Sequence, residues 1–115
     1  MTSFEAGDIV RVLFPQIERN VRRVRPALVL TLEPIGPDGQ LIWAAMITNA
    51  ARERWPGDVL IDDHSAAGLP VASMVRTVKV ATIERSGAER IGRMPAAGMS
   101  EVRRLVQSYL APGPA

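Results

Sequence analysis

The sequence has 115 residues, of which 47% are hydrophobic and 23% are charged, with 14 basic and 12 acidic side chains, one histidine and no cysteine. This balance predicts one globular domain over residues 1–115 and excludes a disordered or fibrous chain. The lack of cysteine excludes disulfides, thiol catalysis and the usual zinc fingers. Residues 1–10 carry no basic stretch followed by an apolar one, and no apolar run approaches the ~18 residues of a membrane span, so we expect a cytoplasmic protein with no membrane partner.

Basic residues cluster in one place. Thirteen of the 14 basic side chains are arginine, and four of them, Arg19, Arg22, Arg23 and Arg25, fall within seven residues. The planar guanidinium group matches phosphate and carboxylate oxygens, so the cluster indicates recognition of such groups, although a coding preference for arginine explains the overall excess equally well. Pro26 fixes the backbone after Arg25 and an apolar run follows, so Arg25 lies at the mouth of a buried strand or, alternatively, on a solvated surface turn.

Apolar and β-branched runs bounded by glycine, proline and polar residues predict strands. In chain order they cover residues 9–14, 27–33, 41–48, 58–61, 71–80 and 91–94, with a further short strand beginning at 82–83. Pro15 is expected to close the first strand, and residues 16–25 to form a polar connection. Asp38-Gly39 predicts a turn that pairs the second and third strands antiparallel, and the run 58–61 is predicted to be an edge strand.

The end of the chain has helical periodicity. From Met99 to Leu110 apolar residues recur at spacings of three and four, Ser100 is a candidate N-cap, and residues 111–115 form a proline-rich tail that we expect to be flexible. Five to seven short strands and one helix on a chain of this length predict a mainly β fold, a small and strongly bent β-barrel with a C-terminal α-helix over about 99–110 packed on it.

Few residues are available for the familiar catalytic constellations. His64 is the only histidine, and no Ser-His-Asp or Cys-His arrangement is in view. Asp62-Asp63-His64 contains metal-ligand residue types, but adjacent positions on an extended loop point in different directions and no distant fourth ligand is evident, so a solvated loop is favoured over a metal site. Neither a P-loop nor a dinucleotide-binding glycine pattern occurs. We therefore expect no metal and no cofactor.

Counting across the predicted turn brings two polar residues together. With the turn centred near residues 36–38, the partner of residue i lies near 73 − i to 75 − i, which places Arg25 opposite residues 48–50. Arg25 and Thr48 would then be neighbours at one end of the barrel, where a guanidinium and a hydroxyl can together hold a phosphodiester. The alternative is that Thr48 only ends a strand and that Arg25 pairs with a carboxylate.

Several short motifs follow one another at credible spacings along nearly the whole chain. They are Gly7-Asp8-Ile9-Val10, Arg25-Pro26-Ala27-Leu28-Val29, Ile47-Thr48-Asn49, Gly68-Leu69-Pro70, Ser73-Met74-Val75-Arg76-Thr77, Thr82-Ile83-Glu84 and Ile91-Gly92-Arg93-Met94, followed by the terminal helix. In this order they resemble the MazF/PemK (Kid) family of type II toxin-antitoxin endoribonuclease toxins. The resemblance implies an SH3-like barrel of the CcdB/Kid/PemK type that forms a homodimer.

The resemblance also implies an activity and its residues. Such toxins cleave single-stranded RNA, including mRNA, without a metal, use the ribose 2′-hydroxyl as the internal nucleophile, and are neutralised by a cognate antitoxin protein. Arg25 and Thr48 match the residues implicated in cleavage and are the expected catalytic residues. The residues expected to bind and guide the RNA are Arg22, Arg23, Asn49 and Arg76.

One position departs from the family pattern. Some members, Kid among them, carry Arg-x-Asp in the later strand, whereas this chain has Val78 two residues after Arg76. A valine cannot accept a proton, so either Arg25 and Thr48 suffice with water or another group, or this copy is slow, altered in specificity or inactive. Two alternatives therefore stand beside the RNA endonuclease: a non-catalytic CcdB-like gyrase poison, and a catalytically impaired toxin homologue retained for antitoxin binding.

Overall fold

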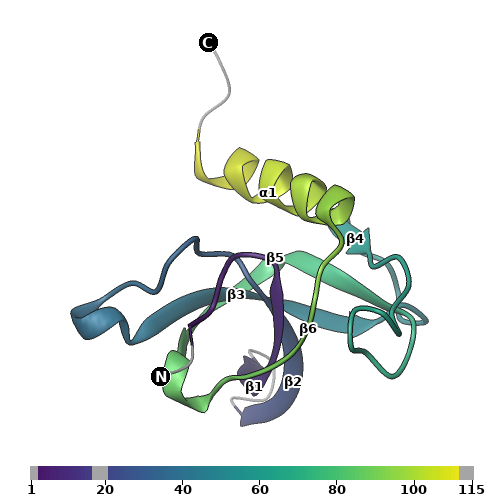
Figure 1. Cartoon of the computed structure of the whole chain (residues 1–115). Helices are drawn as coiled ribbons and strands as arrows, with labels where there is room; N and C mark the ends of the chain where they lie inside the picture. Colours follow the sequence, from purple (N-terminus) through teal and green to yellow (C-terminus); the bar gives the residue numbers. More distant parts are fainter. Residues whose placement is uncertain (1–2, 17–20, 112–115) are drawn as a thin grey trace.

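The structure is a computed structural model that describes residues 3–16 and 21–111. Within these ranges the chain forms six strands and one α-helix, in the order β1 (Asp8–Gln16), β2 (Val21–Val29), β3 (Leu41–Asn49), β4 (Asp58–Leu60), β5 (Ser73–Glu84), β6 (Glu89–Arg93) and α1 (Ala96–Leu110). The strands form one antiparallel sheet in the order β4-β5-β3-β2-β1-β6. Figure 1 shows the sheet bending so that β1 and β2 cross β3 and β5, while α1 lies along one side.

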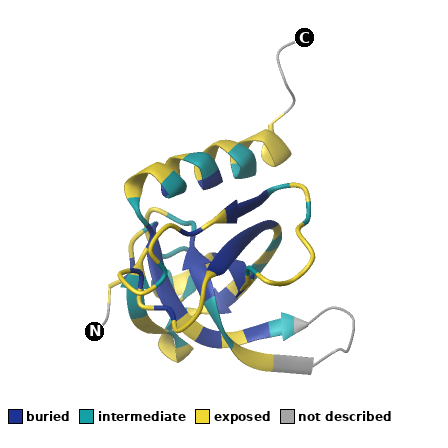
Figure 2. Ribbon diagram, turned by 90° about the vertical axis from the view of Figure 1, so that its right-hand side faces the viewer, coloured by how far each residue is buried: buried dark blue, intermediate teal, exposed yellow. Residues whose placement is uncertain are grey.

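The sheet buries apolar side chains on both faces, because successive residues of a strand point to opposite sides. The helix-side cluster joins strand residues to α1 and includes Ile9, Leu28, Ile47, Val75, Met99 and Val102. The far-side cluster is enclosed by the bent sheet itself and includes Phe4, Val10, Val12, Ala27, Val29, Ala44 and Met46. Figure 2 shows the result: the strands are largely buried, and α1 buries only the side that faces the sheet.

The predicted mainly β fold with a C-terminal helix is confirmed. The antiparallel pairing of the second and third predicted strands is present as Ala27 opposite Met46 and Val29 opposite Ala44. The predicted edge strand is β4, which pairs only with β5. The predicted end of the third strand is wrong by one residue, because β3 continues to Asn49.

The first two strands were predicted too short at the hairpin that joins them. β1 runs through Pro15 to Gln16, and β2 begins at Val21 and ends at Val29, so residues 21–25 belong to a strand rather than to a connection. Pro15 of β1 pairs only with β2, and Pro26 of β2 pairs only with β1. A proline fits at such edge positions because its missing N–H removes no ladder hydrogen bond.

The fifth strand and the helix also differ from their predicted bounds. β5 is one strand of 12 residues that includes Thr82 and Ile83, and β6 begins at Glu89. Ala45 pairs with Val80 while Met46 pairs with Arg76, so residues 77–79 form a bulge in β5. This bulge explains the imperfect alternation of the sequence there. The helix begins at Ala96 after Pro95, one turn before the predicted N-cap Ser100.

Among the residues that the structure describes, no helix has the length and apolar character needed to cross a membrane. Arg19 and most of the predicted flexible tail, residues 112–115, lie outside the described ranges.

Candidate active site

The two predicted catalytic residues lie at one end of the far-side face. Continuing the register of Ala27 with Met46 by two residues places Arg25 opposite Thr48. Residues opposite each other on antiparallel strands point to the same face. Ala27 and Met46 belong to the far-side cluster, so Arg25 and Thr48 extend that face beyond its apolar part. The last pair of β2 with β3 is Ala27 with Met46, so the neighbourhood of Arg25 and Thr48 stays a prediction that agrees with this register.

Thr48 carries a hydroxyl that lacks a hydrogen bond. The residue is only 3% exposed, and its Oγ1 atom is buried without a partner among the described residues. Buried hydroxyls are normally satisfied, and an exception calls for an explanation such as a ligand. An anionic oxygen that enters the site would supply the missing partner.

Arg25 is half-buried and surrounded by positive charge. Burial is the main cause that lowers its pKa below the ordinary value, and the charges of Arg52, Arg23 and Arg76 lower the pKa further, in that order. Every charge that shifts this pKa is cationic, and none of the described carboxylates pairs with Arg25, Arg23 or Arg52. We call these three residues the cationic cluster; an anion bound there would relieve both the repulsion and the desolvation.

Arg76 differs from the other arginines because it is buried and paired. Its Nε and Nη2 atoms donate to Asp58 Oδ1 and Oδ2 at 3.1 and 2.9 Å, and Nη2 also donates to the Glu53 carbonyl at 2.8 Å. Its guanidinium carbon lies 3.9 Å from the centre of the Trp55 ring. The sequence predicts that Arg76 binds RNA; in the structure its Nε and Nη2 donate within the protein.

The other predicted RNA-binding residues lie near the same end of the sheet. Arg23 is exposed on β2 opposite Phe14. Arg22 lies opposite Pro15, and its side chain is outside the described part of the structure. Asn49 is exposed at the end of β3, and its Oδ1 accepts a hydrogen bond from the Ala51 N–H at 2.8 Å.

Arg52 is the site residue that the sequence analysis missed. It lies in the loop of residues 50–57, four positions after Thr48, and its N–H donates to the Asn49 carbonyl at 3.1 Å. It is also the charged neighbour with the largest effect on the pKa of Arg25. The loop follows Thr48 directly, but nothing in the order of residues indicates that the charge of Arg52 acts on Arg25.

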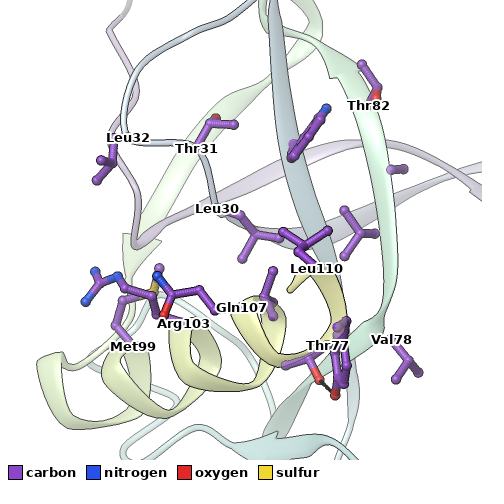
Figure 3. Close-up of a pocket in the computed structure, with 15 residues that line it drawn as sticks. Leu30, Thr31, Leu32, Thr77, Val78, Thr82, Met99, Arg103, Gln107 and Leu110 are labelled. Carbon is purple, nitrogen blue, oxygen red and sulfur yellow. Dashed lines mark hydrogen bonds between the residues drawn. The ribbon is translucent and has the colours of Figure 1, made fainter. Parts of the chain in front are cut away.

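A second feature is an apolar groove between α1 and the exposed side of β3 and β5, with a volume of about 730 Å³ (Figure 3). Its lining includes Leu30, Leu32, Trp43, Val78, Val80, Tyr109 and Leu110. None of the three residues of the cationic cluster lines it. Val78 also lines this groove. It occupies the position at which some members of the MazF/PemK family carry aspartate.

No group of three or more potential metal ligands occurs among the described residues, and Asp62, Asp63 and His64 do not form one. Instead, Asp63 Oδ1 accepts a hydrogen bond from the Ala66 N–H at 3.2 Å, and the His64 carbonyl accepts one from Leu69. These contacts are those of a loop stabilised by its own backbone.

Fold and site define a small, mainly β protein with a cationic cluster and a buried hydroxyl that has no partner among the described residues. The family model described as "PemK-like, MazF-like toxin of type II toxin-antitoxin system" matches residues 5–110. The chain belongs to this toxin family. No curated protein sequence matches it closely enough to count as a relative.

Solved structures agree with this assignment. The crystal structure of MazF (Form-I) from Deinococcus radiodurans is 29% identical, covers 96% of this chain and 98% of that chain, and has a TM-score of 0.76. A crystal structure of MazE-MazF from the same organism is 28% identical with a TM-score of 0.72, over 96% and 98% of the two chains. An endoribonuclease from a mycobacterial species shares the fold, with 16% identity, a TM-score of 0.71 and coverage of 99% and 98%.

Proposed function

We propose that this chain is an endoribonuclease toxin that cleaves single-stranded RNA, including mRNA, at the Arg25–Thr48 site without a metal ion or cofactor. The observation that carries the proposal is that the half-buried Arg25 is repelled by its cationic neighbours and that the buried hydroxyl of Thr48, which the extended β2–β3 register sets against Arg25, has no partner among the described residues. Both groups lack the anionic partner that a phosphodiester would supply. Membership in the toxin family supports the same activity.

The reaction needs no side-chain nucleophile. The ribose 2′-oxygen attacks the adjacent phosphorus and the bond to the 5′-oxygen breaks, which leaves a 2′,3′-cyclic phosphate and a 5′-hydroxyl. Arg25 donates hydrogen bonds to the non-bridging oxygens, where negative charge grows during the attack, and Thr48 donates one that positions the phosphate. A guanidinium stays protonated near neutral pH, so Arg25 is not the base. Water takes the proton of the 2′-hydroxyl and supplies one to the 5′-oxygen.

The RNA strand is guided by side chains at the same end of the sheet. Arg23 on β2 contacts phosphates on one side of the site, and Asn49 and Arg52 contact the strand on the other. Arg76 contributes indirectly, because it is bonded to Asp58. Contacts to phosphates position the strand but carry no sequence information, so base preference depends on other contacts.

The protein acts in the cytoplasm as a homodimer that a cognate antitoxin neutralises. Exposed apolar residues on the groove support the dimer, since Leu32, Val80 and Leu110 are 76%, 44% and 70% exposed in the single chain. The MazE-MazF structures of Deinococcus radiodurans contain a similar toxin with its partner, which supports an antitoxin here.

The two alternatives from the sequence have less support. The gyrase-poison alternative requires neither Arg25 nor Thr48. The impaired-toxin alternative rests on Val78, but this residue faces the groove, so within one chain the valine does not remove a carboxylate from beside Arg25.

The proposal is tested with purified protein and a mixed-sequence RNA in the presence of a chelator. We expect cleavage of the RNA, products that end in a 2′,3′-cyclic phosphate and a 5′-hydroxyl, and no cleavage of the same sequence as DNA or 2′-O-methyl RNA. Cleavage of 2′-O-methyl RNA, or dependence on a divalent cation, would contradict the mechanism.

A further inference from the structure

The 50–57 loop carries Arg52 and is held at its far end by one buried aspartate. Asp58 Oδ2 accepts a hydrogen bond from the Trp55 N–H at 2.8 Å, and the Asp58 N–H donates to the Trp55 carbonyl at 3.0 Å. The Asp58 carbonyl also accepts a bond from Arg54 Nη2 at 3.3 Å. The Asp58 side chain is fully buried, and the bonds that this residue accepts from Trp55 and Arg54 are partly buried.

Arg76 completes the attachment from β5. Its guanidinium bonds both oxygens of Asp58, reaches the Glu53 carbonyl and stacks on Trp55, so it contacts two residues of the loop and the aspartate that follows it. Its side chain is 6% exposed. Asp58 and Arg76 are opposite each other on β4 and β5, and Arg76 is opposite Met46 on β3, two residues before Thr48. The loop is thereby tied to the strand that presents Thr48.

We infer that Asp58 and Arg76 are positioning residues, which fix the 50–57 loop so that Arg52 faces the phosphate held by Arg25 and Thr48. The inference rests on the proposed function. It replaces the sequence-based prediction of direct RNA binding by Arg76 with an indirect role. A planar guanidinium suits this role because it can bond a carboxylate with two donors, reach a carbonyl and stack on an aromatic ring at once.

The chain contains a matched control for this arrangement. Asp8 has a side chain that is 3% exposed, accepts a hydrogen bond from the Glu5 N–H at 2.9 Å and pairs with Arg93 and Arg90 at 2.8 and 3.0 Å. It lies at the start of β1, beside β6 and at the opposite end of β1 from the hairpin of β1 and β2. Replacing either aspartate by asparagine removes one negative charge from a buried carboxylate site.

The test measures how RNA affinity depends on salt. A 2′-O-methyl RNA of mixed sequence serves as an uncleavable probe, and binding is followed by fluorescence anisotropy from about 50 to about 200 mM salt. We expect Arg52→Ala to make the slope of log K against log salt shallower by about 0.7, the value of one phosphate contact on a single strand. Asp58→Asn should give the same decrease, and Arg52→Ala combined with Asp58→Asn should give no further decrease. Asp8→Asn should leave the slope unchanged.

The alternative roles predict other results. If Arg76 binds phosphate directly, Asp58→Asn frees it, and binding becomes tighter with a steeper slope. If the ion pair only stabilises the fold, Asp58→Asn lowers the melting temperature and leaves the slope equal to that of Asp8→Asn. Either result would overturn the inference. Should Asp58→Asn fail to fold, Arg76→Lys keeps the charge but lacks the planar fork that bonds both oxygens of Asp58 while it stacks on Trp55, and it should give the same shallower slope.

A second measurement does not depend on RNA. Amide hydrogen exchange of residues 50–57 should be at least tenfold faster in Asp58→Asn than in Asp8→Asn, because only the former releases the loop. Equal exchange in the two variants would overturn the positioning role. If the wild-type protein binds no RNA, the proposed function fails, and the exchange data alone decide whether the loop is held in this way.

Discussion

The start of β1 and the start of β4 are built in the same way, with different consequences. In both places a glycine with positive φ, 99° at Gly7 and 90° at Gly57, precedes an aspartate. Each aspartate accepts a hydrogen bond from the N–H three residues before it, and each returns its own N–H to the carbonyl of that same residue. Each also pairs with arginine from a neighbouring strand.

The difference lies in what surrounds each turn. The arginines at Asp8 have side chains that are 49% and 57% exposed, whereas the Arg76 side chain is 6% exposed. The chain before Gly57 is the loop that follows Thr48, whereas the chain before Gly7 is the N-terminal segment. The same local structure therefore stabilises the fold at one end of the molecule and, in our account, orients a functional loop at the other.

The largest expected effect is the difference in stability between the asparagine variants of the two aspartates. Asp58→Asn should lower the free energy of unfolding by about 3–5 kcal/mol, because it leaves Arg76 buried without its counter-ion. Asp8→Asn should cost about 1–2 kcal/mol, because Arg90 and Arg93 can be solvated. Urea unfolding of both variants checks this, and equal losses would mean that burial of the arginine does not matter.

The second largest difference in stability is expected between alanine substitutions of the two glycines. A Cβ at Gly57 would lie 2.5 Å from the Tyr109 hydroxyl and 2.9 Å from Thr77 Oγ1, whereas at Gly7 the nearest atom would be 3.6 Å away. Both positions have positive φ, so Gly7→Ala should cost about 1–2 kcal/mol of strain, and Gly57→Ala about 3 kcal/mol because the hydroxyl pair must also separate. Thermal unfolding measures the difference. A Gly7→Ala variant as unstable as Gly57→Ala would contradict this account of the packing.

A smaller effect is expected from the contact between α1 and the Gly57 turn. Thr77 Oγ1 donates to the Gly57 carbonyl at 2.6 Å, so the Tyr109 hydroxyl, 2.8 Å away, is the donor to Thr77. Tyr109→Phe should cost about 0.5–1.5 kcal/mol, because Thr77 keeps its bond to Gly57. Thermal unfolding measures this too, with Ser108→Ala on the exposed side of α1 as the control. A loss above the range would show that the Gly57 turn itself depends on Tyr109.

The smallest expected change is in the melting temperature of Arg25→Met. Burial and the charges of Arg52, Arg23 and Arg76 lower the pKa of Arg25, which means that the folded state disfavours its charge. Removing that charge should leave the melting temperature unchanged or slightly higher, and the gain should shrink as salt screens the repulsion. A clear loss of stability at low salt would mean that Arg25 has a structural role.

The sequence predicts much of this architecture because strands and helix leave local signals. Alternation, the Asp38-Gly39 turn and the spacing after Met99 predict the antiparallel pair and the helix, and both are present. The bulge at 77–79 could not be predicted from local signals. It arises because β5 pairs with β3 on both sides of a shift in register, and this pairing involves residues far apart in the sequence. The burial of Arg76 was missed for a related reason: its partner Asp58 lies 18 residues away on another strand.

In the proposed mechanism RNA cleavage depends on Arg25, and the single-turnover cleavage rate of one RNA with a chelator present tests this most directly. We predict that Arg25→Ala lowers this rate by about 10²–10³-fold or more, while Asp8→Asn, at the distant turn, cleaves at the wild-type rate. Folding of both variants is checked by circular dichroism. An Arg25→Ala protein that is folded and cleaves within about tenfold of the wild-type rate would contradict the account.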